Sequence, residues 1–124
     1  MCYNFLVKNI NEISGIDFQK VLLYFDGDIE IFDEVLKVAV DDAENKILRL
    51  KNAFEQKNFL NYQNEAHSLK SSLATFGVEK LAERAKKHEF AAKENNIEFI
   101  KSDYEEFVVE YKKFISEAAN YLGK

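Results

Sequence analysis

One stretch of sequence decides the fold, residues 62–77, which reads YQNEAHSLKSSLATFG. Its apolar residues recur at steps of four, three, four and three positions, and they are Tyr62, Ala66, Leu69, Leu73 and Phe76. This spacing places them on one face of an α-helix, because a helix turns about 100° per residue. The stretch therefore predicts an amphipathic helix that ends at Gly77 and turns its apolar face toward a core.

The remaining flank of this helix carries polar and small side chains, which lie roughly 80–180° away from the apolar stripe. They are Gln63, His67, Lys70, Ser71 and Ala74. His67 is therefore expected to face water, with Lys70 one turn further along. An ordinary solvated histidine is one interpretation of this pattern. The other is a surface that carries a phosphoryl group, since a neutral imidazole is a nucleophile at cytoplasmic pH and lysine neutralises phosphate charge.

The composition indicates one domain without a membrane or export segment. The 124 residues are enough to bury roughly two-thirds of the surface of the unfolded chain. No apolar run approaches the roughly 20 residues of a membrane span, and residues 1–5 lack the pattern of a signal peptide, so a cytoplasmic protein is expected. The net charge of −5, with both signs interspersed, argues against a nucleic-acid partner.

Amphipathic patterns elsewhere in the chain predict an all-α fold. A short helix is expected to start at the N-cap Asp17 and to end at Asp26-Gly27. Long helices follow from residue 28 to the joint Lys57-Asn58, from about 59 to 76, from 78 to Asn95-Asn96, and from about 97 to 122. Connections this short force neighbouring helices to run antiparallel. The chain is therefore expected to be a single domain, residues 1–124, with an N-terminal arm and short helix over 1–27 and an up-down four-helix bundle over 28–122.

The first long helix has two apolar faces. The main stripe consists of Phe32, Leu36, Ala39, Ala43, Leu50 and Phe54. A second face is formed by Ile31, Val35 and Val38, and it is expected to pack under the short helix.

A motif with fixed spacing runs through the decisive stretch and the helix after it. In the stretch it comprises His67, Leu69, Lys70 and Gly77, and on the next helix Leu81, Ala85 and Glu89. With these residues the chain, from about residue 16 to 122, resembles a histidine-containing phosphotransfer (HPt) domain of bacterial two-component phosphorelays. The lead-in Asp26-Gly27-Asp28, followed by a long acidic helix, is similar to stand-alone members of that family.

Three positions differ from the family pattern. Ser71 stands where the family nearly always has glycine, Leu73 where a small residue is usual, and His88 where an apolar residue is usual. Serine is still small, so the close approach of a partner is expected to survive, with a hydroxyl beside the imidazole. His88 lacks a lysine three positions later, and we interpret it as a residue of the helix face rather than as a second phosphorylation site.

The resemblance implies that His67 accepts a phosphoryl group from a receiver-domain aspartate or a sensor histidine kinase and passes it to a response-regulator receiver. Lys70 would stabilise the charge of that group. The receiver would supply the aspartate and the Mg²⁺, so no cofactor or metal is expected on this chain. The sequence also has no Gly-rich phosphate loop, and we therefore expect a phosphocarrier that neither binds ATP nor phosphorylates itself.

Glu89 falls on the inner stripe of its helix, where a carboxylate needs a partner. Lys70 and a ring nitrogen of His67 are the candidates. If the nitrogen donates to Glu89, the carboxylate fixes the tautomer and leaves the other nitrogen free to attack. A partly exposed salt bridge without that role is the alternative. The expected docking surface for a receiver adds Gln63, Asn64, Ser68, Ser71, Ala74 and Thr75.

Two other classes of function compete with phosphotransfer. A metal-binding bundle would use His67, His88, Glu65 and Glu89, but the Glu-x-x-His spacing of helical di-iron proteins is missing. A non-catalytic adaptor bundle that has lost phosphotransfer is the second, and it predicts that a His67→Gln variant keeps its partner binding and signalling.

Overall fold

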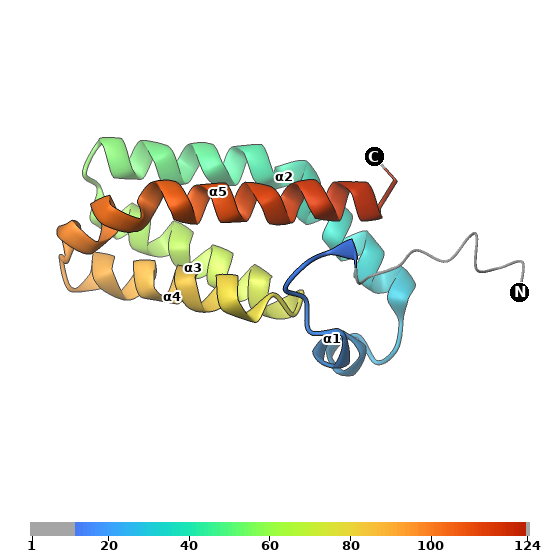
Figure 1. Cartoon of the computed structure of the whole chain (residues 1–124). Coiled ribbons are helices and arrows are strands. Elements are labelled where there is room, and N and C mark those ends of the chain that lie inside the picture. The colour runs from blue at the N-terminus through green and yellow to red at the C-terminus, as the bar shows by residue number, and fades with distance from the viewer. Residues whose placement is uncertain (1–11, 124) are drawn as a thin grey trace, which may run out of the picture.

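A computed structural model describes residues 12–123. Its helices are α1 (Phe18–Tyr24), α2 (Ile29–Glu55), α3 (Phe59–Thr75), α4 (Glu79–Lys93) and α5 (Ile97–Tyr121), as Figure 1 shows. Beside them the described residues contain one isolated β-bridge, between Ile16 and Val78. The all-α prediction is therefore confirmed. Most of the expected N-terminal arm lies outside the described residues, which begin at residue 12.

The helix boundaries follow from local side-chain chemistry. Side-chain oxygens of the N-cap residues accept hydrogen bonds from the first free backbone N–H groups, and these caps are Asp17, Asp28, Asn58 and Asn96. Chain reversal after each helix uses a residue with positive φ, namely Asp26, Gly27, Lys57, Gly77 and Asn95. Such residues end a helix because the left-handed conformation cannot continue it.

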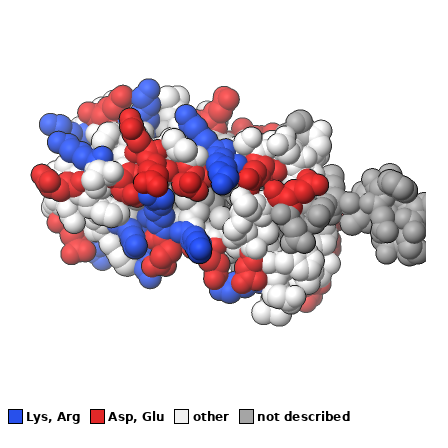
Figure 2. Space-filling view, in the orientation of Figure 1, with Lys and Arg blue, Asp and Glu red and all other residues white. Residues whose placement is uncertain are grey.

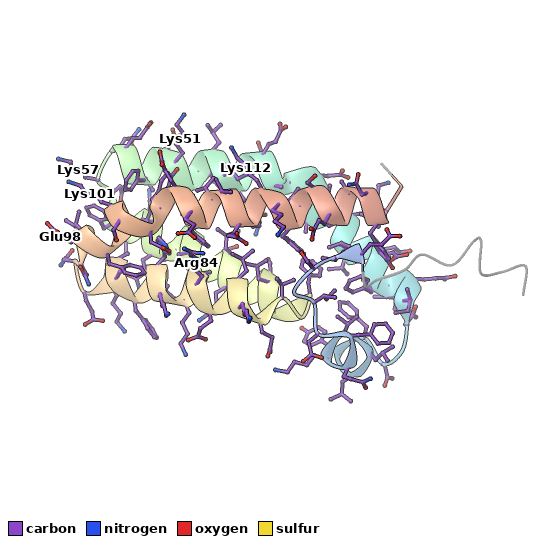
Figure 3. All side chains as sticks on the ribbon, in the orientation of Figure 1. Lys51, Lys57, Arg84, Glu98, Lys101 and Lys112 are labelled. Atoms are coloured by element: carbon purple, nitrogen blue, oxygen red, sulfur yellow. The ribbon has the colours of Figure 1, made fainter. Side chains whose placement is uncertain are left out.

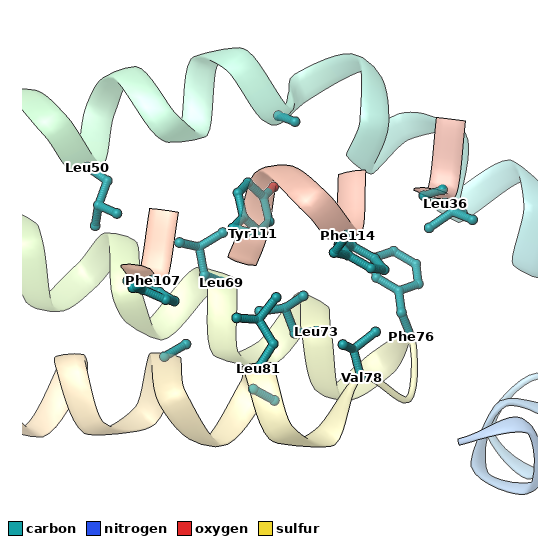
Figure 4. Close-up of a cluster of buried hydrophobic side chains, with 14 of the residues drawn as sticks. Leu36, Leu50, Leu69, Leu73, Phe76, Val78, Leu81, Phe107, Tyr111 and Phe114 are labelled. Atoms are coloured by element: carbon teal, nitrogen blue, oxygen red, sulfur yellow. The ribbon is translucent and has the colours of Figure 1, made fainter. Parts of the chain in front are cut away.

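Helices α2 to α5 form an antiparallel bundle. The chain reverses direction at each short connection, α3 packs most extensively against α4, and α2 contacts α5 to close the bundle (Figure 1). The predicted stripes meet in its centre, where Leu50, Leu69, Phe107, Tyr111 and Phe114 are buried together (Figure 4). The up-down four-helix bundle is thus confirmed, and α3 contributes buried residues to its core from Tyr62 to Leu73.

Gly77 ties the end of α3 to the segment before α1. Its carbonyl accepts a hydrogen bond of 2.7 Å from the backbone N–H of Asp17. The backbone of Gly77 has a φ of +74°, and a Cβ atom at this position would lie 2.9 Å from the Asp17 carbonyl oxygen. Only glycine fits both the left-handed turn and this close approach. The contact anchors α1 beside the C-terminal end of the phosphoacceptor candidate helix.

The second apolar face of α2 does not pack under α1, so this prediction is wrong. Ile31, Val35 and Val38 are 48%, 38% and 68% exposed. Phe25, which ends α1, instead meets Phe32 on the main stripe, with 5.4 Å between ring centroids and an edge-to-face geometry. One aromatic contact therefore takes the place of the expected helix-on-face packing.

Both signs of charge are interspersed on the surface seen in Figure 2, where acidic side chains gather along the centre of the view and basic ones flank them. No broad basic face is present on that side. Among residues 12–123, no helix combines the length and the apolar character that crossing a membrane requires.

Candidate functional site

His67 lies near the middle of α3, on the side turned away from the bundle. Its neighbours on the inner side, Ala66 and Leu69, are almost completely buried, whereas 58% of the His67 side chain is exposed. The buried stripe of α3 sets this orientation, because a helix that buries Tyr62, Ala66 and Leu69 turns position 67 outward. The imidazole is therefore rigidly held at its base and open to a partner.

Glu89 reaches across from α4 and contacts both predicted partners at once. Its Oε2 lies 2.8 Å from Nδ1 of His67, and its Oε1 lies 3.0 Å from Nζ of Lys70. The Glu89 side chain is only 12% exposed, and apart from the Lys70 ion pair Oε1 is buried without a well-aligned hydrogen bond. The two alternatives considered for Glu89, an orienting contact and a salt bridge, are therefore both present in the geometry.

Burial and hydrogen bonding act on the Glu89 carboxyl in opposite directions. Burial raises its pKa, but the contacts with Lys70 and His67 together lower it more, and the net pKa is below the usual value. Glu89 is thus a carboxylate at neutral pH and can only accept. Nδ1 of His67 must then carry the hydrogen and donate it, which leaves the lone pair on Nε2. Among residues 12–123, Nε2 of His67 has no hydrogen-bond partner.

Small residues bring α4 close enough for this contact. Ala66 on α3 and Ala85 on α4 are both fully buried, and Ala82 is 8% exposed. Alanine at such positions allows a short interhelical distance, because no longer side chain separates the backbones. Glu89, one turn beyond Ala85, therefore lies alongside α3 within reach of His67 and Lys70.

The six predicted docking residues all belong to α3 and lie on its outer side or at its margins. Asn64, Ser71 and Ala74 are exposed, and Gln63, Ser68 and Thr75 are half-buried. The Thr75 hydroxyl donates to the Ser71 carbonyl at 2.9 Å, so it is engaged with its own helix. The Ser68 hydroxyl accepts from Nζ of Lys46 on α2 at 3.0 Å, a neighbour that the sequence analysis did not identify.

His88 is not on an open helix face, and that interpretation is wrong. Its side chain is fully buried, and its ring stacks on Phe107 with centroids 4.3 Å apart. Nδ1 lies 2.8 Å from the Tyr62 hydroxyl and Nε2 lies 2.9 Å from Oδ2 of Asp103. Arg84 donates to both oxygens of the same aspartate, at 2.8 and 2.6 Å, from its place between α4 and α5 (Figure 3).

These contacts make a closed polar network across α3, α4 and α5. Hydrogen bonds to Arg84 outweigh burial and hold the pKa of Asp103 at about 2, so Asp103 is ionised. Burial lowers the pKa of His88 more than Asp103 raises it, so the ring is neutral. It then donates from Nε2 to Asp103 and accepts from the Tyr62 hydroxyl at Nδ1. Every polar group is satisfied, which explains how a histidine takes an apolar position.

The network makes stability depend on pH in two stages. The pKa of His88 in the folded chain lies below the ordinary 6.5 of the unfolded chain. The contribution of His88 to stability is therefore complete above pH 6.5. It falls at lower pH because His88 binds a proton in the unfolded chain before it does so in the folded one. One proton gives a slope of at most about 1.4 kcal/mol per pH unit. Asp103 adds a second loss of stability as the pH falls from 3.8 toward about 2.

We expect His88→Leu to abolish the first stage. The free energy of unfolding is measured against pH by chemical unfolding, in a His67→Gln background.

Tyr62→Phe/His88→Leu serves as the control, because it removes the hydroxyl that His88→Leu would leave without an acceptor. Equal slopes between about pH 6.5 and 5 in chains with and without His88 would contradict this account.

The four residues of the rival metal site do not form one cluster, although His67 and Glu89 are in contact. Glu65 pairs with Arg49 at 3.2 Å, and His88 is enclosed in its own network. Within residues 12–123 no group of three or more His, Cys, Asp or Glu side chains is arranged to hold a metal ion.

Comparison with protein families found a match with a family described as the Hpt domain, over residues 34–122. The match covers more than half of the chain and includes His67, Lys70 and Glu89. Comparisons with curated proteins and with solved structures found no match.

Proposed function

This chain belongs to the Hpt domain family, whose members act in phosphotransfer in two-component signalling, and we propose that it is a phosphorelay intermediate with His67 as the phosphoacceptor. It would accept the phosphoryl group from a receiver aspartate or a histidine kinase and pass it to a response-regulator receiver. One observation carries the proposal: Nδ1 of the exposed His67 ring lies 2.8 Å from the Glu89 carboxylate, a contact that supports an Nδ1–H tautomer with its lone pair on Nε2.

In the proposed step, the Nε2 lone pair attacks phosphorus of the partner's aspartyl phosphate. The bond between phosphorus and the carboxylate oxygen breaks, and the aspartate leaves as a carboxylate. The ring keeps its Nδ1 hydrogen and becomes a phosphorylated imidazolium, whose positive charge lies 2.8 Å from Glu89. The return to a second receiver reverses these bonds. No proton has to be removed at any stage.

Lys70 has a separate task in this mechanism. Lys70 lies one helical turn from His67 on the same side of α3, and its side chain is 28% exposed. From there the ammonium can contact the phosphoryl oxygens, either in place of its ion pair with Glu89 or together with it. It would neutralise the charge that builds up on these oxygens. The chain thus supplies a nucleophile, an orienting carboxylate and a cation, and we expect the receiver to supply Mg²⁺. The expected partners are receiver domains and a sensor histidine kinase in the cytoplasm, not nucleic acid or a membrane.

The test is transfer of label from phosphorylated receiver domains to the full chain. We expect label that is lost in acid and retained in base, as phosphohistidine requires, and no label from ATP alone. If several receivers give no label while circular dichroism confirms the folded helices, the proposal fails and the adaptor function takes its place.

A further inference from the structure

Lys46 on α2 places a positive charge beside the phosphoacceptor helix, and within residues 12–123 it has no ion-pair partner. Its Nζ donates to the Ser68 hydroxyl at 3.0 Å and lies 3.5 Å from the Ser72 hydroxyl. Ser68 directly follows His67 in α3. The Lys46 side chain is half-buried, and no carboxylate among residues 12–123 lies within ion-pair distance of it. A half-buried ammonium with only neutral partners can form an ion pair with an anionic group of a partner protein.

The nearby carboxylates are already committed to another cation. Arg49, three positions after Lys46, pairs with Glu65 at 3.2 Å and with Asp42 at 3.6 Å. The contact with Glu65 bridges α2 and α3, the same two helices that Lys46 joins through Ser68. Arg49 is therefore the direct ion-pair partner of both carboxylates, and neither of them lies within ion-pair distance of Lys46.

Lys86 provides a similar charge on the opposite margin, from α4. It precedes Glu89 by three positions and so lies on the same side of its helix. Its Nζ stands 5.6 Å above the ring of Phe90, a neutral partner, and within residues 12–123 it forms no ion pair. The helices on both sides of α3 thus each carry a lysine that forms no ion pair within residues 12–123, although the whole chain has a net charge of −5.

We propose that Lys46 and Lys86 are docking residues that receive acidic side chains of the receiver, next to its aspartyl phosphate. This inference rests on the proposed function and names the partner chemistry at that site. An aspartyl phosphate is anionic, and a partner that presents it is repelled by a chain of net negative charge. Lys46 and Lys86, on the helices that flank α3, would attract the acidic partner surface locally. Such charges act on the rate of encounter more than on the chemical step.

The test compares Lys46→Gln, Lys86→Gln and the double variant with Lys112→Gln. Lys112 is an exposed lysine of α5 that lies away from α3 (Figure 3) and serves as the matched control. Transfer from a phosphorylated receiver is followed at low and at high salt. Each single variant should lower kcat/KM about threefold to tenfold at low salt through KM, and the difference should vanish near 0.5 M salt. Phosphorylation of His67 by phosphoramidate, which has no protein surface, should stay at the wild-type rate.

Three outcomes overturn the inference. If Lys46→Gln and Lys86→Gln have the same kcat/KM as Lys112→Gln, the two charges do not dock a receiver. The proposed function is unaffected by that result as long as the wild-type chain accepts phosphate from the receiver. A slower reaction with phosphoramidate assigns the lysines to chemistry rather than to docking. A wild-type chain that takes no label from any receiver overturns both the proposed function and the docking role.

Discussion

The His67→Gln variant is expected to take no phosphoryl group from any receiver. A glutamine side chain is an amide, whose nitrogen lone pair is delocalised and does not attack phosphorus. Glutamine is also a good helix former and its amide can donate to Glu89, so α3 and its contact with α4 should remain. The expected loss is complete, down to the background of the labelling measurement, while helical content and unfolding midpoint stay near those of the wild type.

The second histidine gives this prediction its internal control. His88 is fully buried and both of its nitrogens are engaged, so it cannot accept the group that His67 has lost. Residual acid-labile label on His67→Gln would therefore mean that another side chain is the acceptor, and it would remove the basis of the proposed mechanism.

The Lys70→Gln variant is expected to transfer phosphate on the order of 100-fold more slowly, the usual cost of removing one charged group that stabilises a transition state. The reason is the loss of the cation that neutralises the phosphoryl oxygens, because the nucleophile and its hydrogen bond to Glu89 remain in place. In single-turnover transfer from a phosphorylated receiver, we expect a lower maximal rate constant and an unchanged half-saturating receiver concentration.

Two comparisons separate this effect from others. Lys112→Gln removes an exposed lysine elsewhere and should transfer at the wild-type rate. Lys70→Arg keeps the charge and should recover much of the loss. A Lys70→Gln variant as fast as the wild type would show that Lys70 only pairs with Glu89.

The fold was predictable because two kinds of sequence signal mark the helices: periodic apolar stripes and residues typical of helix ends. Asp17 was identified as a cap from residue type and position, and its side chain accepts backbone hydrogen bonds from Gln19 and Lys20. The error at Ile31, Val35 and Val38 has a physical cause. Periodicity says which residues share a face, but not which of two apolar faces a short neighbouring helix will cover.

The site was only partly predictable, for a related reason. Glu89 could be placed because a carboxylate on an inner stripe requires a partner on the next helix, and His67 and Lys70 were the available groups. The burial of His88 was missed because its partners, Tyr62 and Asp103, are distant in sequence and belong to other helices. Lys46 was missed because a long flexible side chain crosses between helices without leaving a periodic signal.

The most direct test of the central claim locates the phosphoryl group on the ring. The full chain, labelled with ¹⁵N histidine, is phosphorylated by a receiver and its imidazole nitrogens are observed by NMR. The account predicts that Nε2 of His67 bears phosphorus, that Nδ1 of His67 keeps its hydrogen toward Glu89, and that both nitrogens of His88 are unchanged. Phosphorus on Nδ1 of His67, or on His88, would contradict it.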